Sequence, residues 1–271
     1  MAEPIDIKLV SAGQVFLGEE PDEEDDDAPM PFWDMLFQKD GEYYSYRHED
    51  ITYDSSPQGL KDLFSRATIV PHKYYCAAIP PDATIAPNDA QNDPGVYLKL
   101  NLPICFDPWW SEESRSSYAH LQRQELEICE VLRRHPHPNI CAYLGYRPHT
   151  DGLRIACLCF ERCEATLVDA VNKGTPDTPR ILDGIRDAIT HLHSLGYAHN
   201  DINPRNIMLA QDGRPVLIDF DSAMKLGEPL GIKGATFGWE YEGDVSKAEN
   251  DLWGLKEVEK YLAGERPAGS H

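Results

Sequence analysis

A polar loop followed by a short hairpin constrains the fold of this chain more than any other stretch of its sequence. Apolar residues recur at helical spacing over residues 182–192 and predict a helix that starts with Thr178 as its N-cap and Pro179 at its first position and ends at Gly196. The polar loop His199–Asn206 comes next. Asp212-Gly213, between two short apolar runs, predicts a tight hairpin that returns the chain to Asp219. This order brings the loop and the end of the hairpin to one place.

Three side chains of this stretch supply oxygen atoms. Asp201 and Asn206 lie in the loop, and Asp219 follows the hairpin. Carboxylate and amide oxygens suit a hard cation such as Mg²⁺, which also binds phosphate oxygens. A second carboxylate near such a cation can accept a proton from a hydroxyl group. The residues therefore indicate metal-assisted chemistry on a phosphate.

The same residues form a known pattern. His199, Asp201 and Asn206, followed by Asp219-Phe220-Asp221, read H-x-D-x-x-x-x-N and then D-F-x. With this pattern the chain resembles the protein kinases. It is most similar to compact protein-kinase-like proteins of fungi, in which HNDINP and DFDS stand in place of HRDLKP and DFG. The similarity covers residues 76–262.

The resemblance implies an α+β chain with two lobes, a strand-rich N-lobe and a shortened helical C-lobe. It also implies ATP and Mg²⁺ as ligands. Asp201 would be the catalytic base, Asn206 and Asp219 would hold Mg²⁺, and His199 would support the loop.

An upstream pair is predicted from a helix stripe. Lys99 ends Val96-Tyr97-Leu98-Lys99, which is similar to the family's V-A-I-K strand. Residues 111–134 predict a helix on which Glu125 lies within an apolar stripe formed by Leu121, Ile128 and Leu132. A carboxylate on a buried stripe needs a cationic partner, so we expect Glu125 to pair with Lys99.

Two further segments are similar to family motifs. Residues 158–163 resemble the strand that leads into the hinge, where Phe160 would be the gatekeeper and the main chain from Glu161 to Cys163 would bind adenine. Asp251 opens a predicted helix over residues 249–262, and its carboxylate would hold the catalytic loop from below.

The chain departs from the family at three points. No G-x-G-x-x-G precedes Lys99, so the loop that covers the phosphates is absent or altered. Asn203 stands where the catalytic loop usually has lysine, which removes a charge that stabilises the transferred phosphoryl group. Lys173 and Arg205 are candidates to replace that charge. Asp221 replaces the glycine of DFG and is a candidate extra metal ligand.

The composition of the chain argues against several classes of function and location. The 46 acidic and 25 basic residues give a net charge of −21, which repels nucleic acid. No run of about 18 apolar residues predicts a membrane-spanning helix, and the first residues do not form a secretory signal. Seven cysteines without a disulfide-scaffold spacing indicate reduced thiols and a cytosolic or nuclear location. Cys157, Cys159 and Cys163 are interpreted as apolar filler of a buried strand rather than metal ligands.

The predicted organisation has three parts. Residues 1–75 form an acidic accessory segment that packs on the kinase-like core, residues 76–161 form the N-lobe and residues 162–271 form the truncated C-lobe. Within the first part, residues 10–17 and 42–53 predict strands. The acidic block Glu19–Asp27 predicts a solvated loop that could dock a basic partner.

Three functions stay open from the sequence. The first is an ATP- and Mg²⁺-dependent phosphotransferase of the Ser/Thr protein kinase type, acting on a protein substrate. The second is a pseudokinase that serves as a binding or scaffold module. The third is a small-molecule kinase of the aminoglycoside or choline phosphotransferase type.

Overall fold

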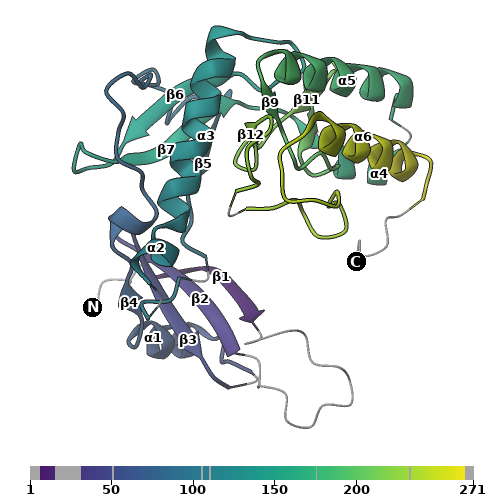
Figure 1. Cartoon of the computed structure of the whole chain (residues 1–271). Helices are drawn as coiled ribbons and strands as arrows, with labels where there is room; N and C mark the ends of the chain where they lie inside the picture. The colour runs from purple at the N-terminus through teal and green to yellow at the C-terminus, as the bar shows by residue number, and fades with distance from the viewer. Residues whose placement is uncertain are drawn as a thin grey trace. The chain divides into compact units, whose positions relative to one another are not determined.

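The computed structural model describes residues 7–15, 32–50, 52–104, 106–109, 111–174, 176–231 and 233–265. The chain forms two compact units (Figure 1). Unit 1 contains residues 1–76 and 101–119, and unit 2 contains residues 77–100 and 120–271. The predicted acidic loop Glu19–Asp27 lies outside the described residues, and the three-part division of the chain stays a prediction.

Unit 1 is built on a four-stranded antiparallel sheet in the order β1-β2-β3-β4. The strands are β1 (Lys8–Val15), β2 (Phe32–Lys39), β3 (Glu42–His48) and β4 (Thr68–Ile69). The helical segments are α1 (Pro57–Phe64), the 3₁₀ turn η1 (His72–Tyr74) and α2 (Glu112–Arg115). Both strands predicted from residues 10–17 and 42–53 are confirmed, although the second ends early, at His48.

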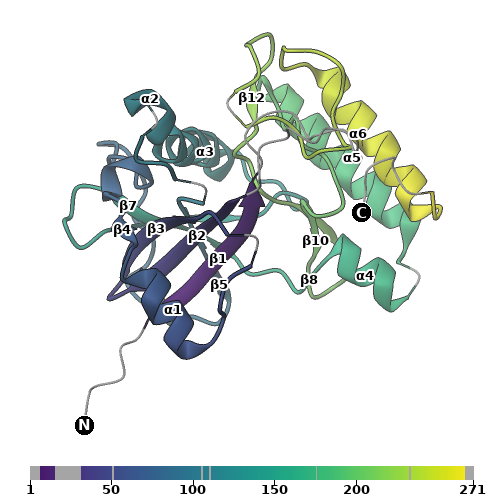
Figure 2. The ribbon, with the colours of Figure 1, turned by 90° about the horizontal axis from the view of Figure 1, so that it is seen from below.

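The apolar run of β2 is explained by its place between β1 and β3. Successive side chains of a strand point to opposite faces of the sheet. Met35 and Phe37 pack with Leu63 of α1, which covers one face (Figure 2). Leu36 belongs to a separate cluster with Val70. A central strand that is covered on both faces can therefore carry consecutive apolar residues, here Met35-Leu36-Phe37.

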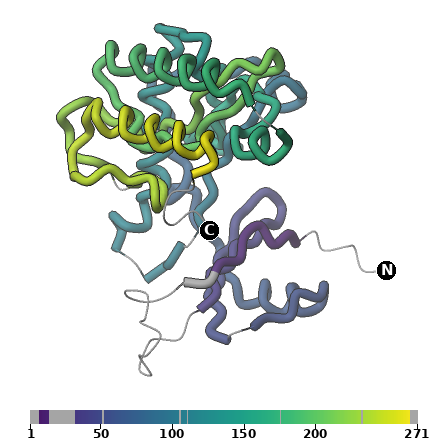
Figure 3. Tube along the Cα trace, turned by 90° about the vertical axis from the view of Figure 1, so that its right-hand side faces the viewer, coloured from purple at the N-terminus to yellow at the C-terminus, as the bar shows by residue number. Residues whose placement is uncertain are grey.

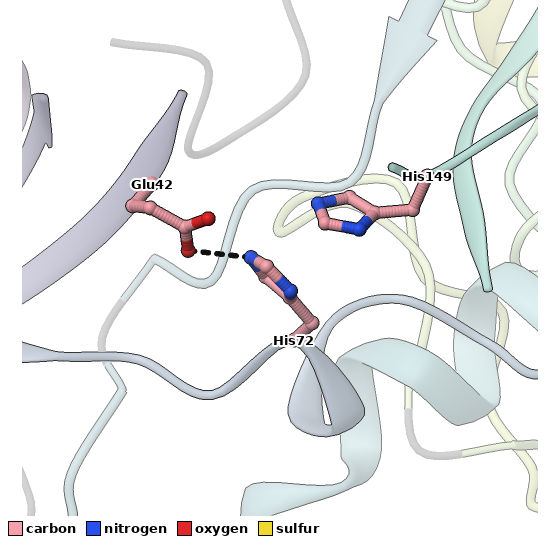
Figure 4. Close-up of side chains that lie close together, drawn as sticks. All are labelled: Glu42, His72 and His149. Atoms are coloured by element: carbon pink, nitrogen blue, oxygen red, sulfur yellow. Dashed lines mark ion pairs between the residues drawn. The ribbon is translucent and has the colours of Figure 1, made fainter. Parts of the chain in front are cut away.

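Two tight contacts fix the start of β3. Asp40 and Gly41 have φ values of 53° and 84°, so they form the two-residue turn that joins β2 to β3. A ring nitrogen of His72 in η1 lies 2.5 Å from a carboxylate oxygen of Glu42 (Figure 4). The turn joins β2 to β3, and the ion pair between His72 and Glu42 holds η1 against the sheet of unit 1.

Unit 2 combines short sheets with helices. A three-stranded sheet has the order β5-β7-β6, a second has the order β11-β10-β8, and β12 pairs with β9. The strands are β5 (Val96–Leu100), β6 (Tyr143–Pro148), β7 (Ile155–Glu161), β8 (Ala165–Thr166), β9 (Tyr197–Ala198), β10 (Ile207–Leu209), β11 (Pro215–Leu217) and β12 (Met224–Lys225). The helices are α3 (Ser117–Arg134), of which residues 120–134 belong to this unit, α4 (Leu167–Lys173), α5 (Thr178–Ser194) and α6 (Ala248–Leu262).

Two helix predictions need correction. The single helix expected over residues 111–134 is divided into α2 and α3 at Ser116, whose hydroxyl donates to the carbonyl of Glu112. Such side-chain bonds compete with the helical backbone bonds. Thr178 was expected to cap α5, but the cap is Asp177, whose carboxylate accepts a hydrogen bond from the N–H of Arg180.

The core of unit 2 is centred on α5. The buried face of α5 packs against β11 and includes Ile185 and Ile189. Helix α5 lies beside α6 (Figure 3). Gly254 of α6 permits a close approach, because a Cβ atom there would lie 2.7 Å from the carbonyl oxygen of Ile202. The glycine lets α6 support the loop that holds Asp201. Among the described residues, none of the helices has the length and apolar character needed to cross a bilayer.

Candidate active site

A partly buried ion-pair network lies in unit 2. Lys99 on β5 donates to both carboxylate oxygens of Glu125 on α3, at 2.7 and 2.8 Å. The same ammonium group donates to Asp219 at 2.7 Å. The apolar stripe on α3 predicts the contact between Lys99 and Glu125. The contact between Lys99 and Asp219 forms because the hairpin ends at Asp219. Lys99 thereby connects strand, helix and hairpin end.

The charges of this network shift one another. Burial opposes the ammonium form of Lys99, but Glu125, Asp219 and Asp221 outweigh it and hold its pKa above the usual range. Burial also acts to raise the pKa of Asp219, yet Lys99 and Lys233 together hold that pKa well below its usual range. Burial raises the pKa of Glu125 in spite of the neighbouring Lys99. The network is stable only while each carboxylate keeps its cationic partner.

The carboxylate of Asp201 accepts hydrogen bonds from four uncharged groups. Its Oδ1 atom accepts from the Asn203 amide and the Thr236 backbone N–H, each at 2.8 Å. Its Oδ2 atom accepts from the Asn206 amide at 2.9 Å and the Thr236 hydroxyl at 3.1 Å. A carboxylate offers about four lone-pair sites. Asp201 is therefore saturated by groups of its own loop and of the segment around Thr236.

The polar loop is held from below by α6. The carboxylate of Asp251 is fully buried and accepts backbone N–H bonds from His199 at 2.9 Å and from Asn200 at 2.8 Å. Asn200 has φ of 63°, a conformation in which Asn is more readily accommodated than most residues. The His199 ring packs on Phe220, and its Nε2 lies 3.0 Å from the carbonyl of Ile218. Asp251 thus holds the loop backbone from outside, and the His199 ring connects the loop to the segment that contains Ile218 and Phe220.

A cavity of about 450 Å³ adjoins the ion-pair network. Its lining includes Lys99, Glu125 and Asp219 together with the predicted hinge residues Phe160, Glu161 and Cys163. The N–H of Glu161 already donates to Ala142, so it is not available to a ligand in the cavity. The structure thus brings the predicted nucleotide-binding residues to one cavity, while the roles assigned to them stay predictions.

The region that replaces a glycine-rich loop has no named strand among its described residues 77–95. Two contacts fasten it instead. Glu130 of α3 accepts bonds from the N–H and hydroxyl of Thr84, at 2.7 and 2.9 Å. Arg162, one residue before Cys163, donates to the carbonyls of Pro94 and Val96, each at 2.8 Å. Side-chain hydrogen bonds from Glu130 and Arg162 therefore hold the region that stands in place of the glycine-rich loop.

Lys233 was missed by the sequence analysis. Its ammonium lies 2.6 Å from an oxygen of Asp221 and 3.7 Å from one of Asp219. Lys173 and Arg205, the expected substitutes for the missing lysine, are both exposed. Lys233 lies in an irregular segment without periodicity, so only its location between D-F-D and Thr236 could have drawn attention to it.

The oxygen atoms near Lys233 fit a divalent cation. Asp219 and Asp221 offer carboxylate oxygens, and Asn206 uses its amide nitrogen for Asp201, which leaves its carbonyl oxygen for a cation. Carboxylate and amide oxygens are the donors that Mg²⁺ takes from proteins. The residues predicted to hold Mg²⁺ are therefore chemically suited to it, with Asp221 as an added oxygen source.

Comparison with known proteins agrees with this geometry. Residues 111–239 match a family model described as the protein kinase domain. The chain is 39% identical over 116 residues to the serine/threonine-protein kinase/endoribonuclease IRE1 of Hypocrea jecorina, a match that covers 38% of this chain and 9% of the relative.

Two yeast proteins are also similar. The probable serine/threonine-protein kinase FMP48 of Saccharomyces cerevisiae is 33% identical over 125 residues, which cover 41% of this chain and 33% of the relative. The serine/threonine-protein kinase SSK22 of the same organism is 30% identical over 160 residues, 55% of this chain and 11% of the relative. The chain thus spans a third or less of the length of these three relatives. The predicted protein-kinase-like α+β fold is confirmed, and the matches support a kinase-like phosphotransferase.

Proposed function

We propose, from the protein-kinase-like fold, that the protein is an ATP- and Mg²⁺-dependent phosphotransferase of the Ser/Thr protein kinase type. One observation carries the proposal: Lys99 bridges Glu125 and Asp219 at 2.7 Å beside a cavity of nucleotide size. An ammonium that is held by two carboxylates from separate elements is preorganised to receive phosphate oxygens. The relatives are named as protein kinases, which favours a protein substrate.

Each residue then has a defined task. Lys99 binds the α- and β-phosphates, and Glu125 holds its ammonium in place. Asn206 and Asp219 hold Mg²⁺, which neutralises phosphate charge when it is bound. Phe160, Glu161 and Cys163 border the adenine. His199 and Asp251 keep the loop in shape.

The proton acceptor must exchange one partner. All four lone-pair sites of Asp201 are used, and the bond from the Thr236 hydroxyl, at 3.1 Å, is the longest of the four. The hydroxyl of the substrate therefore replaces the Thr236 hydroxyl on Oδ2 and gives its proton to Asp201 as its oxygen attacks the γ-phosphorus of ATP. The bond between this phosphorus and the bridging oxygen of the β-phosphate breaks, and ADP is the leaving group. Asn203 orients Asp201 but brings no charge, so Lys99 and Lys233 supply the positive charge.

A second candidate function rests on the same contacts. A saturated Asp201 and a neutral Asn203 also suit a pseudokinase that binds nucleotide and a protein partner without transfer. In either case we propose a cytosolic or nuclear protein, because the six cysteines within the described residues are free thiols.

The test combines binding and chemistry. Ligand at about 100 times its Kd adds about 2.7 kcal/mol to the stability of the native protein, so Mg²⁺-ATP should raise the melting temperature of the wild type. The increase should require Mg²⁺ and should fade in Lys99→Met. Phosphate transfer to a generic Ser/Thr peptide library should disappear in Asp201→Ala, with the ATP-dependent increase retained.

The control is Asp183→Ala, which removes an exposed carboxylate of α5 that forms an ion pair with its helix neighbour Arg186. It should leave both measurements unchanged. Full transfer by Asp201→Ala would refute the assignment of the base. A Mg²⁺-dependent melting increase without transfer to any substrate would establish the pseudokinase instead, and no increase at millimolar ATP would refute nucleotide binding.

A further inference from the structure

Two cysteine thiols line the cavity beside the hinge. Cys141 and Cys163 both border it, and their side chains are hydrogen-bonded to each other. The Cys141 sulfur also lies 3.4 Å from the carbonyl oxygen of Glu161. Cys141 is buried apart from the cavity wall, whereas Cys163 is half-buried. The sequence analysis interpreted Cys163 as strand filler, but it follows β7 and faces the cavity, so a small solute can reach it.

A second thiol pair in the same unit provides an internal comparison. Cys157 and Cys159, two residues apart on β7, also hydrogen-bond to each other. Both belong to a buried cluster with Ala86, Ala90 and Val96, and neither lines the cavity. The filler interpretation holds for these two. The two pairs share their chemistry and differ in their access to solutes.

We infer that Cys163, with Cys141 as its partner, is a covalent modification site for peroxides and for small thiol-directed electrophiles. The single S–H proton of Cys141 is donated to the Glu161 carbonyl; when Cys163 ionises, this proton is available to the Cys163 sulfur and stabilises its negative charge. The thiolate is the nucleophilic form of cysteine. This hydrogen bond also lowers the pKa of Cys163, although burial opposes the shift. Burial and the same contact raise the pKa of Cys141. Cys163 is therefore the thiol that attacks the oxidant or electrophile, and Cys141 is the thiol that resolves the oxidised Cys163 to a disulfide.

The reaction with a peroxide is balanced as follows. The Cys163 thiolate attacks one oxygen of hydrogen peroxide, the O–O bond breaks, and the released hydroxide takes a proton to form water. The Cys163 sulfenic acid that results is attacked by the Cys141 sulfur, which loses its proton. An S–S bond forms and a second water leaves. Two thiols are oxidised to one disulfide, and one hydrogen peroxide is reduced to two waters.

The modification has a consequence that rests on the proposed function. A disulfide draws Cys163 toward Cys141, and an adduct on Cys163 fills space in the cavity. Either change alters the hinge main chain that would border adenine. We therefore expect modification and nucleotide binding to compete.

Trypsin separates the two pairs, which makes the test direct. Cleavage after arginine and lysine places Cys141 in the peptide 135–154, because the bond between Arg147 and Pro148 resists cleavage. Cys157 and Cys159 lie in the peptide 155–162, and Cys163 lies in the peptide 163–173. A Cys141–Cys163 disulfide thus links two peptides, whereas a Cys157–Cys159 disulfide stays inside one.

The full chain is treated with hydrogen peroxide or with iodoacetamide under native conditions and digested, and the peptides are measured by mass spectrometry. We expect the linked pair 135–154/163–173 after peroxide, and its loss in Cys163→Ser and in Cys141→Ser. We expect Cys163 to alkylate at least about tenfold faster than Cys157 or Cys159, because Cys163 borders the cavity, where a solute can reach it, whereas the other two lie in a buried cluster. Cys157→Ser is the matched control and should leave the linked pair unchanged.

Mg²⁺-ATP separates this inference from the proposed function. Protection of Cys163 by the nucleotide supports both. Fast alkylation of Cys163 with the linked peptide but without protection supports the modification site and counts against nucleotide in this cavity. Alkylation of Cys163 no faster than that of the buried pair, or no linked peptide at any peroxide dose, would overturn the inference while leaving the ATP-dependent melting increase intact.

Discussion

Replacing Lys99 with methionine should leave one buried carboxylate without its partner. Both oxygens of Glu125 accept bonds from Lys99, and the side chain is only 4% exposed. The backbone N–H of Phe220, at 3.3 Å from Oε1, is too weak a substitute. Asp219 and Asp221 keep Lys233 as a cation. The cost of Lys99→Met therefore falls mainly on Glu125.

The expected loss follows from this isolation. Removing one partner of a buried pair costs about 3–5 kcal/mol. In a domain of this size, each kcal/mol lowers the melting temperature by about 2–4 °C, so Lys99→Met should melt about 6–20 °C below the wild type at pH 8.

The loss should depend on pH. Burial already raises the folded-state pKa of Glu125, and removal of Lys99 raises it further. A carboxyl whose folded pKa exceeds its unfolded value of about 4.3 binds a proton on folding, so stability declines as pH rises from the unfolded toward the folded pKa. Protonation of Glu125 removes the isolated charge, so the penalty shrinks as the pH falls toward the raised folded-state pKa. Lys99→Met should therefore be closest to the wild type in acid.

Calorimetric melting at pH 5.5 and pH 8 measures both effects. Lys225→Met removes an exposed lysine of β12 and serves as the control, with no shift expected. The double variant Lys99→Met/Glu125→Gln should recover most of the loss, because the isolated charge is gone. Equal destabilisation at the two pH values, or no recovery in the double variant, would show that Glu125 is not the isolated group and would refute this reasoning.

Two further substitutions test the loop and the segment that faces it. Lys233→Met should lower the rate of phosphate transfer by about tenfold to a hundredfold, and Lys233→Arg should retain most of it, since a cation at this point stabilises developing charge. Steady-state kinetics of both variants measures the rates, and a methionine variant as active as the wild type would exclude this role of Lys233. Asp251→Asn replaces one of the two carboxylate oxygens that accept from the buried N–H groups of His199 and Asn200. One of these N–H groups then lacks its acceptor, which should lower the free energy of unfolding by about 1–3 kcal/mol. Urea unfolding measures that loss, and an unchanged midpoint would mean that α6 does not hold the loop.

The parts of the site that the sequence predicts are local or periodic. His199, Asp201 and Asn206 share one loop, so their proximity needs only a turn. Glu125 was identified because a charged residue on an apolar stripe requires a partner, and Lys99 lies in contact with it. Patterns of this kind can be recognised without the fold, because they involve residues that are close to one another in the sequence.

The parts that the sequence does not predict come from irregular segments. Thr236 meets Asp201 across 35 residues, and Lys233 reaches Asp221 across 12. Neither belongs to a helix or strand, so no period predicts which way its side chain points. The thiol pair was hidden for a related reason, since Cys141 and Cys163 lie 22 residues apart and meet only where β7 ends. Long-range contacts of loops depend on the assembled fold.

The discontinuity of unit 1 has a consequence for how the chain is made. Residues 77–100 interrupt this unit, so its second part, residues 101–119, leaves the ribosome only after a segment of unit 2 has been synthesised. The side-chain amide of Asn101 binds the carbonyl oxygens of Tyr75 and Tyr118, at 2.6 and 2.7 Å, and so ties both parts together. Domains generally fold as units during synthesis. Unit 1 must therefore wait for its last residues, and an expression fragment that stops at residue 76 would carry its sheet without the segment that completes its core.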